Sequence, residues 1–564
     1  MKSISILFVN FMLCTSLLIA QNSNNSSTVQ VLESKIEQNG IDSALEWYKA
    51  SGRTHQPEAM ANLAYNLVEQ SKFDEGLKLL KLNVSTFPNN KDVFNPRYMC
   101  NIASYLWKNN EEQRAVKYLD LNMRVFPKLE RSHSCYGDYY IKQGQNALAA
   151  KYYKKAASLN PENNLFQIAF KAKSNTYRPT EIPKDTLKLF KRFGDMNNKN
   201  AFVYVQGGPM LRHIIHDNDA LNLLPNSEQL LKIYPMQAAM LNPEMVVSIP
   251  KLTPEQSDFE NIQSAEILHR VISYLKTQGK TVYLIGHSYG ASIVMEYLNK
   301  HPSQADKIAL MGKDFDEDMR SYEGLKSGMY IRWKDGEEPV LKPFFRDMSE
   351  SFIKEYKLNY VADNLTMMVK THSAKRFTEL LKDKDLSHVF FVHARFDEAN
   401  GRVHEKELQF LRSKGVTTVE TYGDHHSMLT KQFMKGVYDY FVNGTPLKQY
   451  TVSYVARLLE SETHDVDAIQ ARVKQQKDTF FPVNENNINA LGYRLLGKEQ
   501  INKAITAFKL NTIWFPKSAN VYDSLGEAYL KANKKDLAIK NYEKSLELNP
   551  DNPNVVKLLK DLKE

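Results

Sequence analysis

One serine in the chain has the surroundings of a nucleophile. Ser288 lies in the segment GHSYG, residues 286–290, directly after the apolar run 281–285. Apolar residues recur at helical spacing behind it, which predicts a sharp turn between a buried strand and a helix. Such a turn strains the serine backbone, and a side chain at Gly286 or Gly290 would collide with a neighbouring element. We therefore expect Ser288 to present its hydroxyl for attack on a carbonyl carbon.

A serine nucleophile needs a base and an acid that orients the base, and two later strand-like runs lead into such residues. Asp397 follows the first run, and the histidine pair His425 and His426 follows the second. Because each lies where a predicted strand ends, these groups can meet Ser288 at one edge of a sheet. Two further acids are alternatives to Asp397, namely Glu398 and Asp424.

The turn at Ser288, followed in chain order by an acid and a histidine, resembles the catalytic arrangement of the α/β-hydrolase superfamily. The resemblance implies a Ser-His-Asp triad in which Asp397 orients the histidine that activates Ser288. In this family the catalytic histidine commonly stands three residues after a glycine and just before a small residue. That spacing favours His426 as the base and leaves His425 as the alternative base.

A second motif carries the same resemblance. The predicted strand 202–205 runs into the segment QGGP, residues 206–209, which is similar to the His-Gly-Gly-Pro turn of the family with glutamine in place of histidine. The resemblance implies an oxyanion hole whose donors are backbone N–H groups, one from Gly208 or a neighbour and one from Tyr289. Backbone donors survive the replacement of histidine, and each contributes roughly 3 kcal/mol to transition-state stabilisation.

The elements that must position these residues alternate as strands and helices through residues 181–446. This pattern predicts an α/β hydrolase domain with a mostly parallel sheet covered by helices on both faces. An insert at about 313–385 interrupts the alternation with patterns rich in large apolar side chains, where the family carries a lid. We expect a helical lid whose apolar groups pack its own small core, with an apolar acyl or aromatic pocket as the alternative use.

Helical periodicity dominates the regions on either side of this domain. Residues 21–180 and 485–564 contain units of about 34 residues that resemble tetratricopeptide repeats, and residues 447–484 form a mostly helical connection. Small residues such as Gly137 and Gly492 let paired helices approach closely. A short amphipathic helix caps the last repeat. The repeats are predicted either to bind a protein partner or to support the hydrolase domain structurally.

The N-terminus indicates export. Residues 1–20 combine Lys2 with an apolar run and end before a polar tract, which is typical of a cleaved signal peptide and predicts a secreted or periplasmic protein without a membrane span after cleavage. The remaining cysteines, Cys100 and Cys135, occupy similar places in successive repeats and could be bonded or free. The net charge of +9 is spread among acids, which argues against nucleic-acid binding.

These features predict a serine hydrolase that cleaves a carboxylic ester through an acyl-enzyme, with no cofactor. One alternative is a proline iminopeptidase-like aminopeptidase, in which lid carboxylates bind the substrate amine; the candidates are Glu317, Asp318 and Glu323. The other alternative is a non-catalytic assembly protein whose repeats carry the function. A metal site is not expected, because His213 and His216, or the pair at 425 and 426, lack a completing ligand at a recognisable spacing.

Overall fold

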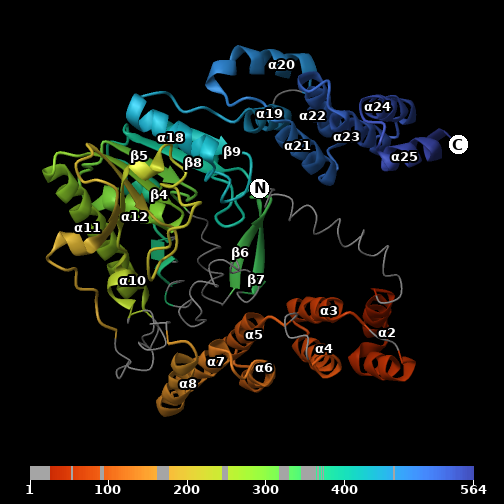
Figure 1. Cartoon of the computed structure of the whole chain (residues 1–564), viewed down its shortest axis with the longest axis horizontal. Coiled ribbons are helices and arrows are strands. Elements are labelled where there is room, and N and C mark those ends of the chain that lie inside the picture. Colours follow the sequence, from red (N-terminus) through yellow and green to blue (C-terminus); the bar gives the residue numbers. More distant parts are fainter. Residues whose placement is uncertain are drawn as a thin grey trace.

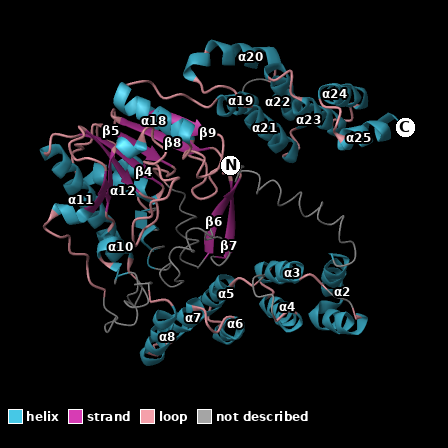
Figure 2. Cartoon of the chain, viewed as in Figure 1, coloured by secondary structure: helices cyan, strands magenta, loops and turns pink. Residues whose placement is uncertain are grey.

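The computed structural model describes residues 26–52, 55–88, 94–161, 177–243, 252–316, 329–343, 374–461 and 464–563, together with residues 245, 364, 367–369 and 371–372. It contains a central domain built on one sheet, with helical repeats before and after it (Figures 1 and 2). The predicted signal peptide, residues 1–20, lies outside the described part of the chain, as do the lid acids Glu317, Asp318 and Glu323.

The central sheet has seven strands in the order β1-β3-β2-β4-β5-β8-β9. Only the edge strand β1 runs antiparallel to its neighbour, so the sheet is mixed but mostly parallel, which confirms the predicted fold class. Its strands are β1 (Phe190–Phe193), β2 (Asn200–Val205), β3 (Leu231–Pro235), β4 (Thr281–His287), β5 (Lys307–Met311), β8 (Val389–Ala394) and β9 (Thr417–Thr421).

Both faces of the sheet are buried, because alternate side chains of the strands belong to different cores. Val203 of β2 packs in one core with helices α11 (Pro254–Thr277) and α12 (Tyr289–Lys300). Phe202 and Tyr204 of the same strand pack in the other core with α18 (Lys431–Asn443). Shorter helices complete the domain: α10 (Ala238–Leu241), α16 (Phe377–Leu380) and α17 (Glu405–Ser413).

The insert differs from the helical lid that we expected. Within the described part of residues 313–385, strands β6 (Met329–Lys334) and β7 (Glu338–Pro343) form an antiparallel hairpin. Its turn places Asp335 at φ 54° and Gly336 at φ 74°. Successive residues with positive φ are typical of the tight hairpin turns for which Asp-Gly is a preferred sequence. The dipeptide was thus a sequence signal for a hairpin, and the helical interpretation of this segment was wrong.

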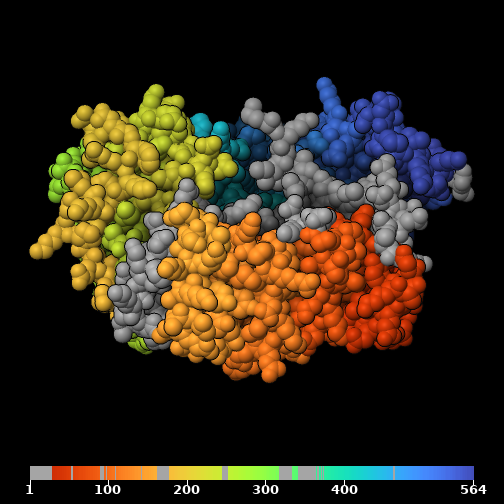
Figure 3. Space-filling view, turned by 60° about the horizontal axis from the view of Figure 1, so that its bottom comes forward, coloured from red at the N-terminus to blue at the C-terminus, as the bar shows by residue number. Residues whose placement is uncertain are grey.

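The N-terminal repeats form an elongated array of antiparallel helix pairs, which runs across the front of the molecule in Figure 3. A Cβ atom at Gly137 would lie 2.5 Å from the Tyr153 ring, so the two helices of that pair can pack only with glycine there. A disulfide joins Cys100 to Cys135 and ties α5 to α7. The helices are α2 (Ser26–Ser51), α3 (Pro57–Glu69), α4 (Phe73–Thr86), α5 (Pro96–Lys108), α6 (Glu112–Val125), α7 (Glu130–Lys142) and α8 (Asn146–Leu159).

The C-terminal helices continue from the end of the central domain and share a separate core. A Cβ atom at Gly526 would lie 2.8 Å from the Tyr542 ring, which repeats the close approach seen at Gly137. The helices are α19 (Thr451–Ser461), α20 (Val466–Gln475), α21 (Glu485–Gly497), α22 (Ile501–Trp514), α23 (Ala519–Lys531), α24 (Lys535–Leu548) and α25 (Pro553–Lys563). Among the helices that the structure describes, none is both long and apolar enough to cross a membrane.

Candidate active site

Ser288 lies between β4 and α12 in a strained backbone conformation, with φ 55° and ψ −126°. Non-glycine residues rarely adopt positive φ, and such strain persists where the surrounding structure enforces it. A Cβ atom at Gly286 would lie 2.8 Å from Val294, and one at Gly290 would overlap the carbonyl oxygen of Val205, the last residue of β2. Side chains at these two positions would therefore push the turn away from α12 and from β2. Ser288 itself remains partly exposed.

Asp397 forms the centre of a hydrogen-bond network at the end of β8. Its Oδ2 atom lies 2.7 Å from Nδ1 of His425, and its Oδ1 atom accepts the N–H groups of Ala399 at 2.9 Å and Asn400 at 2.8 Å. Burial alone would raise the pKa of this carboxyl group. The neighbouring His425 and the two N–H donors outweigh burial and lower the pKa of Asp397 below its usual value of 3.8. Asp397 is therefore ionised and able to orient a histidine.

Residue spacing favours His426 as the base, but in the structure Asp397 contacts His425 and not His426. The His425 side chain is buried, whereas His426 is exposed and its N–H donates to Asp424 at 3.1 Å. The N–H of Ser427 donates to the carbonyl of Asp424 at 3.0 Å. This tight turn directs the first histidine of the pair inward. Counting residues from Gly423 could not detect the turn, so spacing alone favoured His426.

The alternative acids have other roles in this structure. Glu398 accepts the backbone N–H of His425 at 3.2 Å through its Oε2 atom. Asp424 is exposed and helps to form the turn that carries the histidine pair. Among the three candidate acids, the described contacts of the His425 ring therefore favour Asp397.

His425 and Ser288 reach the same edge of the sheet. The N–H of Ser288 donates to the carbonyl of Met311, the last residue of β5, at 2.8 Å. A Cβ atom at Gly312, the next residue, would lie 3.2 Å from Cε1 of His425. The ring centroids of His287 and His425 are 5.2 Å apart. The nucleophile turn and the Asp397–His425 pair thus converge on the carboxyl ends of β4 and β5.

The glycine turn after β2 also lies against Ser288. A Cβ atom at Gly207 would lie 3.2 Å from Cβ of Ser288, and Gly208 has φ 136°. Tyr289 begins helix α12, where the first N–H groups have no partner within the helix and carry partial positive charge. The backbone at Gly208 and Tyr289 is therefore available to stabilise negative charge that develops beside Ser288.

Two glutamines hold this turn, and the sequence indicated only the first. The side chain of Gln206 donates to Asp219 at 3.2 Å and accepts the N–H of Ile214 at 3.3 Å. The buried Gln237 spans the turn, because its Oε1 accepts the N–H of Met210 at 2.7 Å and its Nε2 donates to the carbonyl of Gln206 at 2.9 Å. Gln237 follows the short strand β3, which no sequence motif marked.

Removing the side chain of Gln237 should disturb the turn without touching Ser288 or the Asp397–His425 contact. We expect Gln237→Ala to lower kcat about 10-fold with little change in KM, because roughly 1.4 kcal/mol of transition-state stabilisation corresponds to a tenfold rate. Steady-state kinetics of ester hydrolysis measure kcat and KM. The matched control is Gln229→Ala, because Gln229 is an exposed glutamine of the same domain. An unchanged kcat would mean that the turn keeps its shape without Gln237.

The structure gives no support to a metal centre among the residues it describes. No group of three or more His, Cys, Asp or Glu side chains there could hold a metal ion. His213 instead lies within 3.4 Å of Gln206 through its Nδ1 atom. Burial, helped by the nearby charge of Lys191, lowers the pKa of His213 to about 4, so this side chain is neutral.

Profiles of known protein families match the central domain and the helical repeats on either side of it. The profile of the alpha/beta hydrolase fold family matches residues 248–349, and tetratricopeptide repeat profiles match residues 130–163 and 519–552. All three matches agree with the resemblances seen in the sequence. No curated protein matches the chain.

Several solved structures are similar to the central domain. An α/β hydrolase from a Medee basin deep-sea metagenome library is 12% identical, with 46% of this chain and 95% of that chain covered at a TM-score of 0.31. A lipase-esterase related protein from Clostridium acetobutylicum is 16% identical, with 45% and 98% covered at 0.30. A carboxylesterase structure from the thaumarchaeon Nitrososphaera gargenis is 15% identical, with 45% and 92% covered at 0.29.

Proposed function

We propose that this chain, in which an α/β-hydrolase domain lies between tetratricopeptide repeats, is a serine hydrolase that cleaves a carboxylic ester. The observation that carries the proposal is the 2.7 Å contact between Asp397 and His425 at the sheet edge where Ser288 is held with φ 55°. A strained serine and an oriented imidazole at one sheet edge are the groups that nucleophilic acyl transfer requires.

In the proposed reaction, His425 accepts the proton of Ser288 while the serine oxygen attacks the ester carbonyl carbon. Backbone N–H groups at Gly208, or a neighbour, and at Tyr289 stabilise the oxyanion. His425 then gives its proton to the departing alkoxide, which leaves an acyl-enzyme. His425 then deprotonates a water molecule, which attacks the acyl carbon. His425 returns this proton to the departing Ser288 oxygen, which releases the carboxylic acid and regenerates the serine hydroxyl. Asp397 holds the imidazole in one tautomer and stabilises its charged form throughout.

The class of substrate is tested directly with the wild-type protein. We expect labelling by a fluorophosphonate probe and faster hydrolysis of short acyl esters than of aminoacyl amides, because the insert at 313–385 is rich in large apolar side chains, which suit an acyl group better than a charged amine. Faster cleavage of aminoacyl amides would instead support the aminopeptidase alternative with its three lid acids. If neither probe nor substrate reacts, the catalytic proposal is wrong.

Export of the protein is a further part of the proposal. The apolar run in residues 1–20 supports a signal peptide, and the Cys100–Cys135 disulfide suits an oxidising compartment outside the cytosol. Cleavage should leave a mature protein beginning near residue 21, which intact mass measurement of the protein from its host would detect. A full-length mass in the cytosolic fraction would contradict this part.

A further inference from the structure

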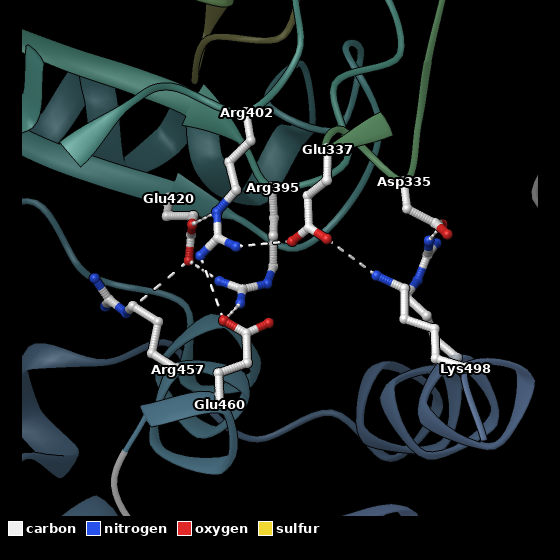
Figure 4. Close-up of polar contacts among 9 residues, drawn as sticks. Asp335, Glu337, Arg395, Arg402, Glu420, Arg457, Glu460 and Lys498 are labelled. Atoms are coloured by element: carbon white, nitrogen blue, oxygen red, sulfur yellow. Dashed lines mark hydrogen bonds and ion pairs between the residues drawn. The ribbon is translucent and has the colours of Figure 1, made fainter. Parts of the chain in front are cut away.

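The loop that carries Asp397 is enclosed by two other parts of the chain. We call residues 395–402, between β8 and α17, the acid loop. The β6–β7 hairpin lies on one side of it, and helices α19 and α21 of the C-terminal region lie on the other (Figure 4). These elements are far apart in sequence, so their convergence on this loop requires an explanation.

The hairpin holds the backbone of the acid loop. The N–H of Trp333 donates to the carbonyl of Glu398 at 3.0 Å, and the N–H of Arg402 donates to the carbonyl of Gly336 at 2.7 Å. A Cβ atom at Gly401 would lie 2.8 Å from the buried Trp333 ring. The hairpin therefore fits closely along the loop, and the two backbones exchange hydrogen bonds at Glu398, the residue next to Asp397, and at Arg402, the last residue of the loop.

Helix α19 binds the arginine two residues before Asp397. Arg395 is only 2% exposed, and its guanidinium contacts Glu420 of β9 at 2.9 Å and, directly, Glu460 of α19. Glu460 also lies 3.5 Å from Arg402 at the other end of the loop. A guanidinium buried this deeply needs both carboxylates, because a buried charge without partners is strongly unfavourable.

Helix α21 binds the residue next to Asp397 and the tip of the hairpin. The guanidinium of Arg494 lies 3.6 Å from the centre of the Phe396 ring and pairs with Asp335. One turn later on the same face, Lys498 lies 3.3 Å from Glu337, which in turn lies 3.0 Å from Arg402. The two helices thus contact the hairpin and the acid loop together (Figure 4).

We propose that the C-terminal helical region positions the catalytic acid, with Glu460 and Arg494 as positioning residues for Asp397. This inference rests on the proposed function, and it assigns α19 and α21 a role in the active site without contact to substrate. It gives these two helices structural support of the hydrolase domain, one of the two roles expected for the repeats. A misplacement of about 1 Å between catalytic groups can cost as much as 100-fold in rate, so small shifts of the loop should be measurable.

A merely stabilising interface would predict a different pattern. Loss of its ion pairs would lower the melting temperature and leave kcat of the folded protein unchanged. Loss of a positioning contact lowers kcat in the folded protein, leaves KM nearly constant, and loosens the acid loop in particular. Amide hydrogen exchange measures the last effect without any reference to activity.

The first test replaces one carboxylate of the pair around Arg395. We expect Glu460→Gln to lower kcat about 10-fold with KM within twofold, and to speed amide exchange in residues 395–402 while β4 and α12 exchange as before. The matched control is Glu543→Gln, because Glu543 pairs with Lys563 at 2.6 Å within the C-terminal repeats. If kcat of Glu460→Gln equals that of wild type, the proposal is wrong whether or not exchange changes.

The second test does not depend on the buried arginine and covers the case in which Glu460→Gln unfolds. Arg494→Met keeps an apolar stem over Phe396, and Asp335→Asn tolerates the left-handed backbone at that position. Each variant removes the same ion pair, so each should lower kcat about 3- to 5-fold. The double variant should lower kcat no further than the more damaging of the two single variants does. Multiplicative losses, or none, would contradict a joint role of the two residues.

The exchange measurement separates this inference from the proposed function. If wild type shows neither labelling nor hydrolysis, the proposed function fails. Faster amide exchange confined to residues 395–402 in the variants would still show that Glu460 and Arg494 restrain the acid loop. If wild type is active but the variants change neither kcat nor exchange, the positioning role fails and the proposed function stands.

Discussion

Ser288→Ala is expected to abolish fluorophosphonate labelling and to lower kcat for ester hydrolysis by at least about 10⁴-fold. The hydroxyl oxygen forms the covalent bond to the acyl group, and no other atom of the turn can replace it. What activity remains would come from oxyanion stabilisation and substrate binding, which act without the nucleophile. Probe labelling detected by intact mass and steady-state hydrolysis measure the two effects.

The control for this substitution is Ser413→Ala, which removes an exposed hydroxyl at the end of α17 in the same domain. This variant should label and turn over as wild type does. The Ser288→Ala protein should also melt close to wild type, because the substitution removes one partly exposed oxygen and creates no cavity. Labelling that persists in Ser288→Ala would show that another residue is the nucleophile.

The sequence predicted the centre of the fold because its signals there are local. The strand before Ser288 is a continuous apolar run, and both flanking glycines are needed for contacts that a Cβ atom would prevent. The repeats were equally readable, since Gly137 and Gly526 accept aromatic rings from the paired helices. Such positions allow few residue types, so their identity alone indicates the structure.

The parts that sequence analysis missed have weaker or non-local signals. The edge strand β1 reads FKRF, and edge strands carry charges that hide the apolar pattern. The dipeptide Asp335-Gly336 is a signal for a hairpin turn. It was missed because the large apolar residues around it were interpreted as helical. Gln237 acts through backbone atoms of a turn far away in sequence. Neither composition nor spacing reports such contacts, which exist only after the chain has folded.

The structure also leads to a clear expectation for the two histidines. His425→Ala should lower kcat/KM about 10⁴-fold, since it removes the group that contacts Asp397 at 2.7 Å, whereas His426→Ala should lower it less than about 5-fold. The pair provides its own matched control, because the residues are adjacent and chemically identical. A collapse of activity in His426→Ala with normal activity in His425→Ala would restore the assignment that residue spacing favoured.

The pH dependence should identify the same base. Asp397 has a lowered pKa and remains ionised well below neutral pH, so its protonation cannot limit activity until the pH falls below about 3.8. Burial and the charges of its histidine neighbours keep the pKa of His287 well below 6.5, so His287 stays neutral over the same range. Activity should therefore fall with acid as a single ionisation, that of the imidazole which must accept the serine proton. His426→Ala should keep this ionisation in its profile of kcat/KM against pH. If it disappears in that variant, His426 is the titrating base and the contact between Asp397 and His425 is structural.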